Sequence, residues 1–106
     1  MATPETQAKD GIKRRLKELK KRFPKQIKCW WYPGAAYMED TVDCMGWVNS
    51  YPFAIEVKRY DGKGDTTKRQ MVTLRECCDA GAYTQIVDSP EQEDRFIRWL
   101  TGRCIS

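Results

Sequence analysis

The sequence contains no histidine, and this absence excludes several kinds of site. Ser-His-Asp and Cys-His catalysis, histidine acid/base chemistry and histidine metal ligation all require an imidazole ring. Neither a GxxxxGK[ST] phosphate-binding loop nor a GxGxxG pattern occurs, so nucleotide binding of those kinds is not expected. Any acid/base or metal chemistry must therefore come from Asp, Glu, Lys, Tyr or Cys side chains.

Long apolar runs are missing as well. No run approaches the roughly 18 apolar residues that a membrane span needs, and residues 1–22 lack the apolar stretch of a signal peptide. The five cysteines are odd in number and form no CxxC pair, which indicates neither a disulfide framework nor a zinc site. We therefore expect a cytoplasmic protein that has no contact with a membrane.

The residues that are present describe a folded domain. Of 106 residues, 41% are hydrophobic and 11% aromatic, which is too apolar for a disordered chain. This length predicts a single domain spanning residues 1–106. A chain of this size buries only about 60–70% of its unfolded surface, so a partner chain would add to its stability.

Positive charge is concentrated at the start of the chain. The formal net charge is +4, but residues 1–28 hold ten basic and three acidic residues, a net of +7. The remainder therefore carries a net charge of −3. A basic segment on a mildly acidic body indicates a polyanionic partner, most simply nucleic acid. The alternative is a solvated helix face rich in lysine.

Hydrophobic spacing and capping residues predict the first four elements. Thr3 as N-cap and Pro4 at the first helical position open a helix that Pro24 ends. Strands are predicted over residues 27–32, 41–48 and 52–59, with a turn at residues 49–50 that makes the last two an antiparallel hairpin. Gly46 lies inside the second strand and is predicted to mark a bulge.

The second half of the chain predicts a helix, a strand and a final helix. Thr67 is a good N-cap, with Gln70 three residues later at capping-box spacing, and Gly81 is expected just after the helix. Residues 83–88 read as a strand, and Ser89 followed by proline opens the last helix. The predicted fold class is α/β, a small mixed sheet flanked by helices in the order α-β-β-β-α-β-α.

The predicted third strand carries a charged pair. Glu56 and Lys58 are two residues apart and so project from one face, opposite to Ile55 and Val57. The alternative to a functional pair is a solvent-exposed sheet face. Asp43 interrupts the apolar run of the second strand, so in the hairpin it would lie beside Glu56. Two adjacent carboxylates favour a cation between them, and without histidine the expected ion is Mg²⁺, with Mn²⁺ as substitute.

These residues resemble a nuclease motif. Asp43 followed by Glu56-Val57-Lys58 is similar to the D…(D/E)xK array of the PD-(D/E)xK superfamily. Residues 53–58 resemble its signature strand, and the loop at 61–67 followed by Gln70 resembles its "G…T-x-x-Q" segment. Within the superfamily the chain most resembles the small phage and bacterial VRR-NUC nucleases, which are similar to Holliday-junction resolvases. The resemblance covers about residues 30–90.

The resemblance implies a restriction-endonuclease-like fold and an intracellular, homodimeric, metal-dependent endonuclease that cuts DNA, with a Holliday junction or other branched DNA as substrate. It implies that Asp43, Glu56 and the Val57 carbonyl bind the metal, and that Lys58 acts near the attacking water or the phosphate. It places Gln70 near the site to orient water or phosphate. It also implies a further acidic ligand on the first helix, for which Glu5 is the candidate.

Alternatives remain for several of these assignments. Glu18 competes with Glu5, Asp40 competes with Asp43, and a capping box explains Gln70 without any role in catalysis. Six basic residues are expected to contact the DNA backbone, with solvated surface charge as the alternative: Lys13, Arg14, Lys17, Lys63, Lys68 and Arg69.

Two other functions are compatible with the sequence. The first is a DNA-binding module on the same fold that does not cut. The second is a phage-type protein that has no enzymatic role and binds another protein. It would do so through its aromatic strand, where Trp30, Trp31 and Tyr32 are consecutive. These three aromatic residues could also stack on bases, whereas core or dimer packing is their more common use.

Overall fold

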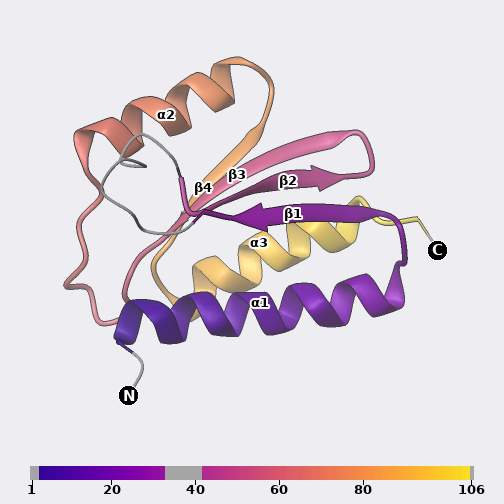
Figure 1. Ribbon diagram of the computed structural model, residues 1–106, viewed down its shortest axis with the longest axis horizontal. Helices are drawn as coiled ribbons and strands as arrows, with labels where there is room; N and C mark the ends of the chain where they lie inside the picture. The colour runs from indigo at the N-terminus through magenta and orange to yellow at the C-terminus, as the bar shows by residue number, and fades with distance from the viewer. Residues whose placement is uncertain (1–2, 33–41, 106) are drawn as a thin grey trace.

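The computed structural model describes residues 3–32 and 42–105. Its elements follow the predicted order: α1 (Pro4–Arg22), β1 (Ile27–Trp31), β2 (Cys44–Val48), β3 (Tyr51–Val57), α2 (Lys68–Asp79), β4 (Tyr83–Val87) and α3 (Pro90–Gly102). The strands form one sheet in the order β1-β2-β3-β4, antiparallel except for the parallel pair β3 and β4. Helices α1 and α3 lie on one face of the sheet and α2 on the other (Figure 1). The predicted mixed α/β fold is confirmed.

The predicted helix starts are confirmed by their caps. The Thr3 hydroxyl accepts the N–H of Thr6, and the Ser89 hydroxyl accepts the N–H of Gln92. Each cap satisfies one of the N–H groups that a helix start leaves without an intrahelical partner. None of the helices within the described ranges is long and apolar enough to cross a bilayer.

Most of the core lies between the sheet and the pair α1 and α3. The apolar stripe of α1, one face of β3 and the inner face of α3 meet there. Its largest fully buried members are Ile12, Phe53, Ile55, Phe96 and Leu100. Burying each such side chain contributes about 1.5–3 kcal/mol, so this layer fixes α1 and α3 on the sheet.

The opposite face has a smaller core. Val42, Ala54 and Leu74 are buried there, with Met45 and Ile86 packed at their edge. Helix α2 makes its main contacts with β3 and β4. Within the described residues, α2 therefore covers this face over β3 and β4. Strand β1 and the C-terminal end of β2 present side chains to solvent there.

An ion-pair cluster holds α1 against α3 and the segment after β3. Nη1 of Arg15 lies 2.9 Å from Oε2 of Glu93 and 2.6 Å from Oδ1 of Asp94. The hydroxyl of Tyr60 donates to Oε1 of Glu93 at 2.8 Å. The first turns of α1 are therefore held close to the carboxyl end of β3.

The bulge predicted at Gly46 is wrong. Gly46 pairs regularly with Cys29 on β1 and with Phe53 on β3. A Cβ atom at this position would collide with the carbonyl oxygen of Lys28 and with the Cα and Cβ of Cys29. The glycine is therefore explained by the close approach of β1, not by an irregularity in the ladder.

We predict that Gly46→Ala destabilises the protein by about 3 kcal/mol, because strand β1 must move away from the new methyl group. Gly102→Ala is the matched control, since nothing lies within 4 Å of a Cβ added there. Urea denaturation of both variants tests this. Equal stabilities for the two variants would contradict the assigned role of Gly46.

Candidate active site

The site is built around a buried carboxyl group at the end of β3. Glu56 is the last residue but one of this strand and is 0% exposed. The ladder pairs Cys44 with Ile55, so Asp43 lies opposite Glu56 one step further along. The hairpin therefore brings the two residues together as predicted, and each carboxyl group shifts the pKa of the other. Within the described residues, neither oxygen of Glu56 has a hydrogen-bond donor.

The solvated sheet face considered as an alternative for Glu56 is therefore wrong. Glu56 and Lys58 share a face as predicted, but Glu56 is fully buried there and Lys58 is half-buried. Taking an ionised carboxylate out of water without a partner costs several kcal/mol. Glu56 must consequently hold a proton or face a cation.

Asp43 is held by two donors. Its Oδ2 accepts the backbone N–H of Val57 at 2.7 Å, and its Oδ1 lies 3.1 Å from Nζ of Lys9 on α1. Lys9 also lies 3.9 Å from Oε1 of Glu5. The sequence pattern does not distinguish Lys9 from the other basic residues of α1. Its spacing of one helical turn from Glu5 is the one signal that marks it.

The two carboxyl groups titrate as a pair. Burial and then the neighbouring Asp43 raise the pKa of Glu56 to about 9. Burial alone would raise the pKa of Asp43 too, but the neighbouring Glu56, the hydrogen bond from the Val57 N–H and the charge of Lys9 lower this pKa below its usual value. At neutral pH the pair of carboxyl groups therefore shares one proton.

Lys58 connects the pair to the start of α2. Its Nζ donates to Oε1 of Gln70 at 3.2 Å. The same oxygen accepts the N–H of Thr67 at 3.1 Å, and the Thr67 hydroxyl accepts the N–H of Gln70. Gln70 thus completes the predicted capping box and also holds Lys58, so the two interpretations of Gln70 are compatible.

The acidic candidates on α1 differ in position. Glu5 is near Asp43 only through Lys9, whereas Glu18 lies further along the helix in a groove with Arg22 and Thr101. In the described part of the chain, no three His, Cys, Asp or Glu side chains are grouped to hold a metal. Asp40 lies outside the described residues.

The pair itself still suits a hard cation. Asp43 and Glu56 supply carboxylate oxygens, and the adjacent Val57 supplies a backbone carbonyl. Mg²⁺ and Mn²⁺ prefer such oxygen ligands, and a group with no donor of its own, as at Glu56, is where a cation would be favourable.

The six predicted DNA-contacting residues fall into two exposed groups. One lies on α1, where Nζ of Lys13 is 5.1 Å from the centre of the Trp31 ring. The other lies in the loop before α2 and in its first turn, close in sequence to Lys58 and Gln70. The groups are Lys13, Arg14 and Lys17, and Lys63, Lys68 and Arg69.

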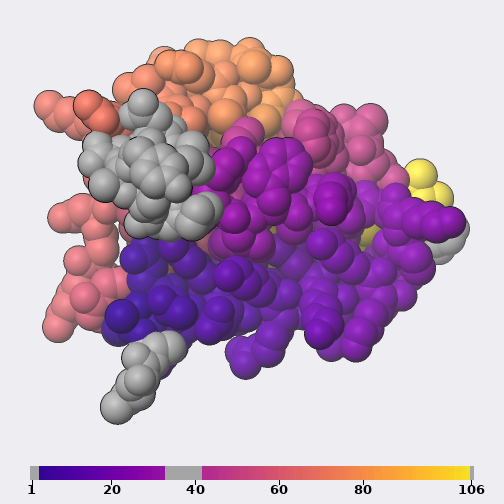
Figure 2. All heavy atoms as spheres, viewed as in Figure 1, coloured from indigo at the N-terminus to yellow at the C-terminus, as the bar shows by residue number. Residues whose placement is uncertain are grey.

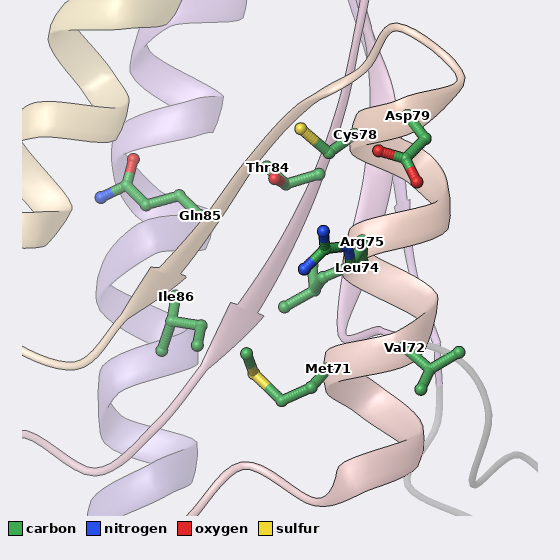
Figure 3. A pocket seen from close by; sticks show the side chains of 9 residues that line it. All are labelled: Met71, Val72, Leu74, Arg75, Cys78, Asp79, Thr84, Gln85 and Ile86. Carbon is green, nitrogen blue, oxygen red and sulfur yellow. The ribbon is translucent and has the colours of Figure 1, made fainter.

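A separate groove of about 610 Å³ lies between α2 and β4 (Figure 3). Met71, Leu74 and Ile86 give it an apolar lining, with Arg75 and Asp79 among its charged residues. The described residues that line it include no pair of carboxylates and no buried polar atom without a partner. We therefore take Asp43 and Glu56, and not this groove, as the candidate site.

Searches against protein-family models, curated proteins and solved structures found no match to this chain.

The pKa of Glu56 predicts a pH dependence of stability. The proton that Glu56 binds in the folded state is lost on unfolding above the ordinary carboxyl pKa of about 4.5. The free energy of unfolding should therefore fall as pH rises from about 4.5 to about 9. Glu56→Gln has no carboxyl group to titrate at this position, so its free energy of unfolding should not show this fall. The variant should be more stable than the parent by about 1–3 kcal/mol at pH 8.

Urea denaturation across this pH range in EDTA measures the effect. Glu76→Gln, at an exposed position of α2, is the control and should leave the pH profile unchanged. A Glu56→Gln profile parallel to that of the parent would show that Glu56 is already ionised in the fold.

Proposed function

We propose that the protein is a Mg²⁺-dependent endonuclease of the PD-(D/E)xK type, with a restriction-endonuclease-like fold, that hydrolyses DNA phosphodiester bonds. One observation carries the proposal. Glu56 is fully buried without a donor beside Asp43, and Lys58 follows on the same face of the strand. This is the residue set that the motif places at a nuclease centre.

The roles follow from the chemistry of each side chain. Asp43, Glu56 and the Val57 carbonyl would hold the ion, with Mn²⁺ as substitute. When bound, the ion supplies a Lewis acid for the phosphate and lowers the pKa of a water. Lys58 stabilises negative charge on the phosphate. Gln70 keeps the ammonium group of Lys58 in place at 3.2 Å and leaves its amide N–H₂ to orient water or phosphate.

Lys9 balances the charge of Asp43 until a divalent ion binds. Its ammonium lies 3.1 Å from Oδ1 of Asp43, so metal binding and the Lys9 ion pair compete for one carboxylate. The proton on Glu56 must also leave before this residue can act as a ligand. Metal affinity should accordingly rise with pH.

The substrate and assembly are proposed from the charge pattern and the motif. The basic surface of α1 would contact the phosphate backbone, which positions DNA without reading its sequence. Branched DNA, such as a Holliday junction, is the proposed substrate. A homodimer would bring two sites to it, one for each strand.

A second function is a DNA-binding module without catalysis. Two observations favour it: Lys9 already neutralises Asp43, and no third acidic ligand joins the pair among the described residues. Such a protein would bind DNA with the same salt dependence and would show no turnover.

Cleavage of a labelled four-way junction, a flap and a matched duplex tests the enzyme. We expect cutting with Mg²⁺ or Mn²⁺ and none in EDTA. Asp43→Asn, Glu56→Gln and Lys58→Met should each lower the rate by about 10²-fold or more, because each removes charge at the reacting phosphate or its ligands.

Glu76→Gln, far from the pair on α2, should cut at the parental rate. Tight binding without cutting under either metal would support the non-catalytic module. Full activity of Glu56→Gln would show that the site is elsewhere.

The basic surface of α1 predicts a salt effect on binding. Replacing Lys13, Arg14 and Lys17 by alanine should reduce the slope of log K against log salt by up to about 3, since each phosphate contact contributes about 0.9. The control replaces Arg95 and Arg98, exposed on α3, and should retain the parental slope. Anisotropy titrations on a duplex at several salt concentrations measure this, and an unchanged slope would show that α1 does not contact DNA.

A further inference from the structure

The sheet face that carries Glu56 continues across β2 and β1 as a surface of aromatic side chains. The N–H of Tyr32 donates to the carbonyl of Asp43, so Tyr32, Asp43 and Glu56 lie in one row across the sheet. In the next row Trp30 pairs with Met45. Side chains of a strand alternate between faces, so Tyr32 and Trp30 share the face of Glu56.

The third row completes this surface. Lys28 of β1 pairs with Trp47 of β2, and both project from the same face. The ring of Trp30 lies 5.4 Å from that of Trp47 and 6.4 Å from that of Tyr32. We call Lys28, Trp30, Tyr32 and Trp47 the aromatic face.

The aromatic face is accessible. Trp30 is 36% exposed and Trp47 is 47% exposed, although tryptophan is usually well buried. Helix α2 lies over β3 and β4. Figure 2 shows the purple atoms of β1 open at the surface between the indigo α1 and the orange α2.

The positive charge of Lys28 on this surface favours a nucleic acid over an uncharged or basic partner. Neither β1 nor β2 contains an acidic residue, and exposed Lys28 lies opposite Trp47. An aromatic ring offers a surface on which any base stacks, worth about 1–3 kcal/mol per base, and a neighbouring lysine attracts the phosphate. Bases inside a duplex are already stacked on one another, so only unpaired ones can use the rings.

We propose that the aromatic face binds unpaired nucleotides of the strand that is cut at Asp43 and Glu56. The inference rests on the proposed nuclease function and narrows its substrate to DNA with a single-stranded segment beside the cleaved bond. Trp30 lies two strands and one row from Glu56, about 10–12 Å at the usual strand spacing.

The test measures binding of a labelled oligothymidine of about 16 nucleotides, and of a duplex of the same length, in EDTA. Trp30→Ala/Trp47→Ala should weaken oligothymidine binding by about 10- to 100-fold and change duplex binding by less than about 3-fold. Trp30→Phe/Trp47→Phe should restore most of the affinity, because a phenyl ring still stacks.

Tyr51→Ala is the matched control. Tyr51 is 50% exposed, and its ring lies 5.2 Å from the guanidinium of Arg103, on the sheet face opposite to Glu56. Loss of this side chain should leave oligothymidine affinity unchanged. If the double alanine variant fails to fold, Trp47→Ala alone, at the exposed end of β2, gives the same comparison.

The outcomes separate this inference from the nuclease proposal, because the binding assay is run in EDTA and does not depend on metal-supported cleavage. Loss of oligothymidine binding supports the aromatic face even if no metal supports cleavage. Unchanged oligothymidine binding in the double alanine variant overturns it even if the protein is a nuclease. Unchanged binding together with a shift from dimer to monomer in sedimentation also overturns it, and shows that the face is a protein interface.

Discussion

The structure depends on a carboxyl group that cannot reach water. Glu56 lies in β3, which has β2 on one side and β4 on the other, so its backbone is paired on both edges, and its side chain is fully buried. Its charge can therefore be balanced only by what the fold places beside it. The parallel pair β3 and β4 puts Glu56 at the carboxyl end of both strands, the edge at which α/β sheets typically bind ligands.

The elements around Glu56 are each fixed by contacts that do not involve the carboxylate pair. Arg15 and Glu93 hold α1 on α3, and this brings Lys9 to Asp43. The capping box of Thr67 fixes the first turn of α2, which brings Gln70 to Lys58. Neither the Arg15–Glu93 ion pair nor the Thr67 capping box includes Asp43 or Glu56. Substitutions of these two carboxylates can therefore alter the site while α1 and α2 keep their positions.

Local signals in the sequence predict the helices and strands, but they do not predict which faces are buried. The caps at Thr3, Thr67 and Ser89 predict all three helices, and alternation places Glu56 and Lys58 on one face. Whether that face is exposed or buried at Glu56 depends on the tertiary packing, which no local pattern encodes. The contact of Lys9 with Asp43 depends in the same way on how α1 crosses the strand ends.

The open half of the sheet follows from the number of helices. A helix with its side chains is about 10 Å wide and strands are about 4.8 Å apart, so one helix covers about two strands. Helices α1 and α3 together cover four strands on one face, whereas α2 alone covers β3 and β4 on the other. In the described chain, β1 and β2 therefore present Trp30 and Trp47 to solvent on the same face as the carboxylate pair. Water is a poor environment for two tryptophans, so a stacking partner at this position would stabilise the surface that the topology leaves open.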